Sequence, residues 1–472
     1  MATTASEFGL VDPATSPYLS GRFAPIHREI STANVAVEGD VPDDLIGTYI
    51  RNGPNPKFTP LGSYSYPIEG DGMLHAVSFG PDTVRYQNRW VRTRGLEAEE
   101  RAGRALFGGI MTPAFVDPAL LGPDPDLGWP TKLDAFINVV AHGGRYLALE
   151  EGLPAYEVSS ELETVGRYDF EGGLPKGMTA HPKFDPLTGE LVVFRYDIEA
   201  PFLTWAIVAA DGSMAQPETM VDGVDHGFMI HDFAITPRYL VVSIGPAVFD
   251  IDAMLAGGPM LSWQPDLGMR IAVIPREGSG PVRWIETDAY WVWHYANAFE
   301  SGDTIAMDFP HWNVPGFLAP DTTVTGAYVR AILDPAAGSI EFETVQDEMT
   351  EFPRIDERRR GCPHRYVIAT ASTGSVPLAP GEHDALCRID LETGTMAEFP
   401  TGGAIGEAIF APKPGGTGEL DGYYLAFVNA LDGDHTTFNI WDAAAFPGTP
   451  RSRIHLPQRV PNGLHGNWFP AT

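Results

Sequence analysis

Short runs of β-branched and aromatic residues recur along the whole chain and predict short β-strands. Helical periodicity is scarce, and it is most evident at Leu96–Leu106 and at Asp252–Ala256. The hydrophobic pattern therefore predicts an all-β protein. The clearest strand-like runs are Leu191–Arg195, Tyr239–Ile244, Arg270–Ile274 and Tyr423–Val428.

Between such runs, an Asp is repeatedly followed by a few turn residues and a Gly, a pattern typical of hairpin reversals. Hairpins spaced tens of residues apart over 472 residues favour a propeller over a sandwich. The repeats are too degenerate for the blades to be counted. We predict an N-terminal arm over residues 1–40 and a single domain over residues 41–472. The turn segments are Asp185–Gly189, Asp211–Gly212, Asp334–Gly338 and Asp390–Gly394.

Composition narrows the class of protein. Hydrophobic residues make up 44% of the chain and charged residues 20%, enough for a sizeable core. A formal net charge of -31, without a run of Lys and Arg, disfavours nucleic acid as a partner. The first thirty residues lack the features of a signal peptide, and no segment approaches the ~18 apolar residues of a membrane span. We expect a cytoplasmic protein, and the sequence indicates no obligate protein partner.

Histidines are the main candidate metal ligands, because the chain has only two cysteines. Four of its thirteen histidines stand out by their context, but thirteen allow many groupings, so the residues alone leave a metal centre open. The four are 50, 63 and 171 residues apart in turn, too far for helical or finger-type zinc motifs. They can meet only if different sheets converge on one axis, as the inner strands of a propeller do. They are His181, His231, His294 and His465.

The segments around these histidines resemble the carotenoid cleavage oxygenase family, which includes the stilbene- and phenylpropanoid-cleaving enzymes. The resemblance runs from about Val41 to Pro470 as a series of ordered blocks. The blocks are Gly47–Pro56, Glu69–Val77, Asn88–Thr93, Ala180–Leu191, Ile230–Thr236, Asn297–Glu300, Glu351–Asp356, Gly406–Lys413 and His465–Pro470.

The resemblance implies a seven-bladed β-propeller with a helical and loop cap, including about residues 92–125, over an iron(II) on the axis. It assigns the ligand positions to His181, His231, His294 and His465. It also implies glutamates that accept the outer N–H of a ligand imidazole and so fix its orientation. These glutamates are Glu151, Glu351 and Glu407.

The implied reaction splits an alkene C=C bond with O2 and yields two carbonyl products, with Fe(2+) as the only cofactor. Four neutral imidazoles around an octahedral iron(II) leave two positions open, whereas a catalytic zinc usually has three protein ligands and a water. Three alternatives stay open. They are a propeller that only binds partners, a hydrolase or lactonase that uses carboxylate and Asn ligands, and an isomerase of the same family.

A carotenoid or apocarotenoid is the first expected substrate. The apolar segment Ala105–Leu121 then forms the tunnel mouth and contacts a membrane peripherally, or it is simply a buried part of the cap.

The alternative substrate is a small phenolic alkene of the 4-vinylguaiacol, isoeugenol or stilbene type. Stilbene-cleaving relatives have a Lys where this chain has Glu150, which argues against a standard stilbene cleaver; Glu150 either accepts a hydrogen bond from a phenol or is a solvated side chain. Ile137 replaces the Thr of many relatives, and either keeps water from an open metal position or packs in the core. The residues expected around substrate and O2 are Phe136, Ile137, Glu150, Trp293 and Phe299.

Overall fold

The computed structural model describes residues 8–121, 132, 134–250, 253, 260–278 and 280–471. Strands dominate this part of the chain, and the labelled α-helices are α1 (Arg94–Ala102) and α2 (Pro118–Leu121). The all-β prediction is therefore confirmed. The helix expected at Asp252–Ala256 falls, apart from Ala253, outside the described residues.

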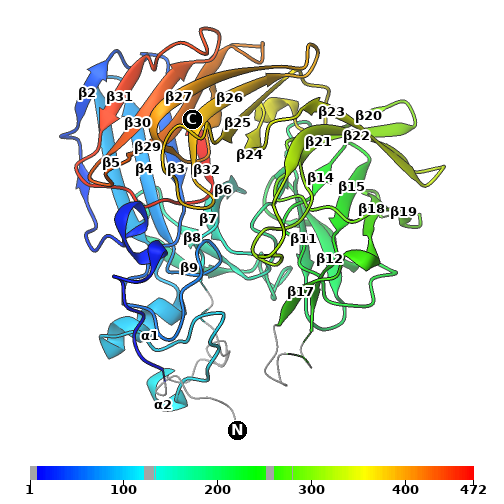
Figure 1. Cartoon of the computed structure of the whole chain (residues 1–472), viewed down its shortest axis with the longest axis horizontal. Coiled ribbons are helices and arrows are strands. Elements are labelled where there is room, and N and C mark those ends of the chain that lie inside the picture. Colours follow the sequence, from blue (N-terminus) through cyan, green and yellow to red (C-terminus); the bar gives the residue numbers. More distant parts are fainter. Residues whose placement is uncertain are drawn as a thin grey trace.

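Helix α1 differs slightly from the helix expected at Leu96–Leu106. It begins earlier because the Thr93 side chain accepts a hydrogen bond from the N–H of Leu96 and so caps the first turn. It ends earlier because Gly103 adopts the left-handed conformation, with φ of +67°, which closes the last turn. Figure 1 shows α1 and α2 together at one end of the molecule, beyond the sheets. No helix in the described ranges is long and apolar enough to cross a membrane.

The strands pair in antiparallel ladders, mostly between neighbours in the chain. Four sheets have four strands each. These are β6 (Asn138–His142), β7 (Arg145–Leu149), β8 (Ala155–Val158) and β9 (Thr164–Tyr168); β10 (Lys183–Phe184), β11 (Leu191–Tyr196), β12 (Leu203–Val208) and β13 (Met214–Met220); β14 (Ala234–Ile235), β15 (Tyr239–Ile244), β18 (Met269–Pro275) and β19 (Arg283–Thr287); and β20 (Asn297–Ser301), β21 (Thr304–Trp312), β22 (Gly326–Asp334) and β23 (Ser339–Gln346).

Two larger sheets and one hairpin complete the set. The hairpin is β16 (Ala247–Phe249) with β17 (Leu261–Trp263). The five-stranded sheet has the order β1 (Ser31–Thr32), β5 (Thr83–Trp90), β4 (Met73–Gly80), β3 (Gly47–Arg51) and β32 (Gly466–Pro470). The nine-stranded sheet contains β24 (Thr350–Arg354), β25 (Tyr366–Ala371), β26 (His383–Asp390), β27 (Thr395–Ile405), β28 (Ile409–Pro412), β29 (Gly422–Ala430), β30 (Thr436–Asp442), β31 (Ser452–His455) and β2 (Ala36–Gly39).

These elements confirm the four strand-like runs, which fall within β11, β15, β18 and β29. The four Asp-to-Gly turns join β10 to β11, β12 to β13, β22 to β23 and β26 to β27. In the turn after β22, the N–H of Gly338 donates to the carbonyl of Asp334 at 2.8 Å, and Gly338 has a φ of +68°, which glycine adopts without steric cost.

The hydrophobic core lies between sheets that follow one another in the chain. In β11, Val192 and Phe194 pack with β15 and β18, whereas Leu191 and Val193 pack with β7 on the other side. Successive side chains of a strand point to opposite faces, so a run of apolar residues can fill two interfaces at once. The sheets are therefore stacked face to face with apolar layers on both sides.

The two ends of the chain also share sheets, with β3 pairing β32 from Gly47↔Pro470 to Arg51↔Gly466. Figure 1 shows this contact as the first, blue strands beside the last, red one. Strands β1 and β2 come from the segment expected to be an arm. They pair with β5 and β31 and form the edges of the two larger sheets. Chain closure therefore fixes the position of the final residues, including His465.

Candidate metal centre

The four candidate histidines occupy the same place in four sheets. Each lies within three residues before the first residue of an edge strand: His181 before β10, His231 before β14, His294 before β20 and His465 before β32. Two of the carboxylates and Ile137 occupy related places in other sheets, with Ile137 before β6, Glu351 in β24 and Glu407 before β28. Positions at the starts of strands therefore carry both the candidate metal ligands and two of the glutamates that orient them.

The structure brings the four histidines together. One nitrogen from each lies within 4.8 Å of the other three. The Nε2 atoms of His181 and His231 are 3.2 Å apart, and those of His231 and His294 are 3.3 Å apart. At metal–nitrogen distances of about 2.1 Å, adjacent ligand atoms lie roughly 3 Å apart, so this spacing suits a single ion.

Three imidazoles are oriented by carboxylates on their outer side. His231 Nδ1 lies 2.6 Å from Glu151, His294 Nδ1 lies 2.6 Å from Glu351, and His465 Nδ1 lies 3.0 Å from Glu407. An ionised carboxylate can only accept a hydrogen bond, and the Oε2 atom of Glu351 that faces His294 also accepts from the N–H of Phe352. Nδ1 therefore carries the proton, and Nε2 carries a lone pair. Lone pairs that converge on one point repel each other unless a cation binds them, so these residues fit a bound metal ion.

Burial keeps two of the imidazoles neutral. It lowers the pKa of His181 and of His294 well below the usual value, and neighbouring histidines add to the effect. His231 differs: burial acts to lower its pKa, but the charge and hydrogen bond of Glu151, together with the charges of Asp232 and Glu351, raise it. A neutral imidazole is the form that can donate a lone pair to a metal.

Each glutamate is itself held by a further donor. Glu151 accepts a hydrogen bond from the hydroxyl of Tyr196 at 2.7 Å. Glu407 accepts one from the N–H of Gly466 at 2.9 Å. Burial acts to raise the pKa of Glu407, but the charge of Arg354 and the contacts with His465 and Gly466 together lower it to about 2. The orientations of His231 and of His465 are thus each fixed through two consecutive hydrogen bonds.

Glu351 has an unusual supporting residue, Phe352. The N–H of Phe352 donates to Glu351 at 2.6 Å, and the ring of Phe352 stacks on His294 with centroids 5.3 Å apart. Phe352 has a φ of +52°, a left-handed conformation that costs an L-residue roughly 1–2 kcal/mol. The register of β24 against β25 shifts at this point, which turns Phe352 towards the histidines.

The other predicted pocket residues are placed as follows. The Ile137 carbonyl accepts a hydrogen bond from the N–H of His465 at 3.1 Å, and Ile137 packs in one core cluster with Phe136. The ring of Trp293 meets the ring of His231 edge-on at 5.2 Å. Phe299 contacts His364 and Arg330 instead.

Glu150 is not a solvated surface group. It accepts a hydrogen bond from the N–H of Asp134 at 2.9 Å, and burial raises its pKa well above the usual value, with the nearby charge of Asp134 adding to the effect. Part of its surface nevertheless stays accessible. Glu150 is therefore largely shielded from solvent, which disfavours its charged form.

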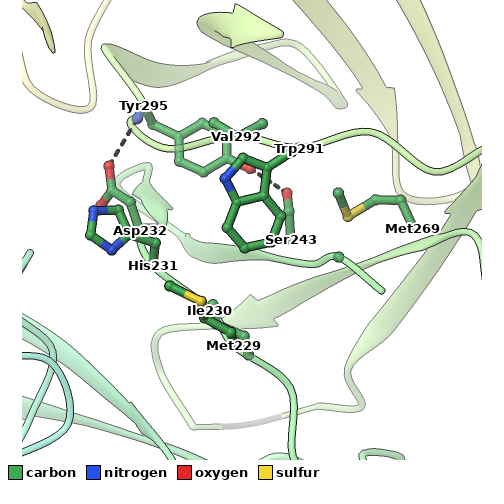
Figure 2. A pocket seen from close by; sticks show the side chains of 10 residues that line it. Met229, Ile230, His231, Asp232, Ser243, Met269, Trp291, Val292 and Tyr295 are labelled. Carbon is green, nitrogen blue, oxygen red and sulfur yellow. Dashed lines mark hydrogen bonds between the residues drawn. The ribbon is translucent and has the colours of Figure 1, made fainter. Parts of the chain in front are cut away.

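A small pocket lies beside His231, lined in part by Ser243, Trp291 and Tyr295 (Figure 2). Asp232 also lines it and accepts a hydrogen bond from the N–H of Tyr295 at 2.8 Å. The sequence blocks contained Asp232, Phe352 and Arg354, but nothing in the sequence indicated which partners they contact.

Comparison with known proteins agrees with this geometry. The family model described as retinal pigment epithelial membrane protein matches residues 23–470. The chain belongs to this family. Isoeugenol monooxygenase of Pseudomonas nitroreducens is 32% identical over 96% of this chain and 98% of its own length. Apocarotenoid-15,15'-oxygenase of Synechocystis is 32% identical over 92% of each chain.

A solved structure extends the family match to three dimensions. The crystal structure of Pseudomonas brassicacearum lignostilbene dioxygenase superposes with a TM-score of 0.89 and 29% sequence identity, covering 97% of this chain and 99% of that one. The resemblance inferred from the sequence is therefore confirmed, because the chain is similar to carotenoid, isoeugenol and stilbene oxygenases over nearly its whole length.

Glu351 gives a pH test of the site in metal-free protein. Burial raises its pKa from 4.5 to about 7, so the folded state holds a proton that the unfolded state has lost between these two values. The stability contribution of Glu351 is present below pH 4.5 and is lost as the pH rises to 7. Relative to Glu351→Gln, we expect the wild type to lose about 3 kcal/mol over this range, measured by urea unfolding. A constant difference between the two proteins would contradict the assignment.

Proposed function

We propose that this chain is an iron(II)-dependent dioxygenase that cleaves an alkene C=C bond with O2 to give two carbonyl products. The observation that carries the proposal is the convergence of four imidazole Nε2 atoms, three of them oriented by Glu151, Glu351 and Glu407. Iron(II), when bound by His181, His231, His294 and His465, would supply the activation of O2. Its relatives, isoeugenol monooxygenase and apocarotenoid-15,15'-oxygenase, support the reaction class.

The residues around the histidines have separate tasks in this proposal. The glutamates hold the imidazole rings so that their lone pairs face the ion. Trp293 and Phe352 line the cluster with aromatic surface, which suits a conjugated apolar substrate better than water. Ile137 is buried among Phe136 and other apolar side chains, and it adds an apolar surface next to His465 that excludes water.

We also propose a seven-bladed propeller, with the nine-stranded sheet counted as two blades, β24–β27 and β28–β31. Strands β27 and β29 pair only over Gly403–Ile405, which suits a contact between two blades rather than one continuous sheet. Core clusters between all neighbouring sheets, including the one that joins β3 and β4 to β6 and β7, support a closed ring. We assign residues 41–472 to this domain, with the cap at about 92–125 and an arm at 1–40. A crystal structure with a different number of four-stranded units would contradict this count.

The first substrate class we propose is a carotenoid or apocarotenoid. The cap exposes Met111, Phe115 and Leu120, with 70%, 49% and 40% of their surfaces accessible. These side chains lie within Ala105–Leu121 and can contact a membrane from which such a substrate is taken.

A small phenolic alkene is the second class, and one observation favours it. Glu150 keeps part of its surface accessible and directly precedes Glu151, which orients His231, so a carboxyl group there can bind a phenolic hydroxyl. The isoeugenol relative supports this class, and the lignostilbene relative supports a phenolic substrate in general.

The metal ligands are tested by His294→Ala, with His226→Ala as control. His226 is an exposed histidine five residues before His231, and its side chain contacts Asp225. We expect His294→Ala to abolish iron loading and O2-dependent cleavage, and His226→Ala to leave both within about twofold. Iron content is measured by atomic emission and products by mass. Full turnover without O2 would contradict the proposed reaction.

The substrate is tested by screening the iron-loaded protein against apocarotenals, stilbenes and 4-vinylphenols. If Glu150 binds a phenol, Glu150→Ala should raise KM for the phenolic alkenes about tenfold, the loss of one hydrogen bond, without changing KM for apocarotenals. Glu161→Ala, on an exposed turn paired with Arg85, is the control. Equal effects on both substrate classes would contradict a phenol contact.

Membrane contact is tested by sedimentation with phosphatidylcholine vesicles. We expect the double variant Met111→Ser/Phe115→Ser to reduce the bound fraction severalfold, because apolar side chains drive the insertion. Leu187→Ser is the control, since Leu187 is 65% exposed on the turn between β10 and β11. Wild-type protein that stays in the supernatant would contradict the contact.

A further inference from the structure

Asp232 is a buried carboxylate that touches three of the four histidine-bearing segments. It follows His231 directly and is 3% exposed. One oxygen, Oδ1, accepts from Lys183 Nζ at 2.6 Å and from the N–H of Phe233 at 2.8 Å. The other, Oδ2, accepts from the N–H of Tyr295 at 2.8 Å. Figure 2 shows the Tyr295 contact next to the imidazole of His231.

The donors identify the segments that Asp232 connects. Lys183 lies two residues after His181, and Tyr295 directly follows His294. These contacts lie at the places where the chain enters β10, β14 and β20. The histidines precede those strands, so sheet ladders do not hold them, and a different interaction has to set their mutual spacing.

The charges make this connection hard to replace. A buried carboxylate is stable only when its oxygens are paired, and here an ammonium group and two backbone N–H groups pair them. Lys183 is buried as well, and it lies over the ring of Phe233 at 5.7 Å. The pair is therefore neutral overall and rigid, with the directional hydrogen bonds of a charged acceptor.

We propose that Asp232 is a positioning residue that sets the spacing of His181, His231 and His294 and thereby the affinity and geometry of the metal centre. The inference rests on the proposed function only as far as the four histidines bind a metal. Substitution of a group that orients metal ligands typically lowers metal affinity about 10–100-fold.

The test compares Asp232→Asn with a matched control, Asp185→Asn. Asp185 is also a buried carboxylate, 4% exposed, and it pairs with the buried Arg276 at 2.5 Å. Its carboxylate contacts Arg276 and the N–H of Leu187, neither of which belongs to a histidine-bearing loop. Both substitutions keep the size of the side chain and remove a negative charge from beside a buried cation, so both should destabilise the fold. The loss should be smaller for Asp185→Asn, because Arg276 keeps its ion pair with Glu190 at 2.7 Å.

The readouts are Co2+ affinity, from competition with a chelator, the visible absorption spectrum of the Co2+ protein, and urea unfolding of the metal-free protein. We expect Asp232→Asn to weaken Co2+ binding at least tenfold and to shift the Co2+ bands, which report ligand geometry. Asp185→Asn should lose stability but keep the wild-type affinity and spectrum. Wild-type affinity and spectrum in Asp232→Asn, or equal losses in both variants, would overturn the proposal.

A double variant keeps the proposal testable if Asp232→Asn alone does not fold. Asp232→Asn/Lys183→Met removes both charges, so it should regain stability, yet it lacks the carboxylate that joins the three segments. Its Co2+ affinity should stay at least tenfold below the wild type, and recovery to the wild-type affinity would overturn the positioning role. Failure of the wild type to bind Co2+ would overturn the metal centre as well. If the Co2+ affinities and spectra are as expected but the iron-loaded protein cleaves no alkene, only the proposed reaction would be overturned.

Discussion

Four imidazole nitrogen atoms within 4.8 Å of one another form the constraint on which the rest of this structure depends. Their lone pairs repel, and His181 and His465 are buried, so the arrangement is unfavourable until a cation binds. Covalent neighbours do not hold them together, since the histidines are separated by 50, 63 and 171 residues. The fold itself must supply the energy that keeps these side chains in place.

That energy comes from the apolar layers between the sheets. Strands such as β11 bury both faces, so each sheet is fixed against the sheets before and after it in the chain. The histidines lie at the ends of edge strands, where small changes in sheet packing would move them directly. Because β3 pairs with β32, the last ligand, His465, is held next to strands from the start of the chain.

Different polar groups hold the three glutamates that orient the histidines. Glu151 is held by a tyrosine hydroxyl, Glu407 by an arginine and a backbone N–H, and Glu351 by the N–H of a residue in a left-handed conformation. The ionised forms of the carboxylates are therefore stabilised to different extents: contacts lower the pKa of Glu407 to about 2, whereas burial raises that of Glu351 to about 7. The site thus combines strongly and weakly stabilised carboxylates around otherwise similar imidazoles.

The sequence by itself determined the local elements and the family. Runs such as Tyr239–Ile244 and turns such as Asp334–Gly338 appear where they were predicted, because side-chain alternation and turn chemistry act over a few residues. The ends of α1 differ from the predicted ones, because the Thr93 cap starts the helix earlier and the left-handed Gly103 ends it earlier. Only the tertiary structure decided that Asp232 joins three histidine-bearing segments, that Phe352 stacks on His294 and that Glu150 accepts a hydrogen bond from the N–H of Asp134. Such contacts join residues tens to hundreds of positions apart, and their geometry follows from how whole sheets pack rather than from any local pattern.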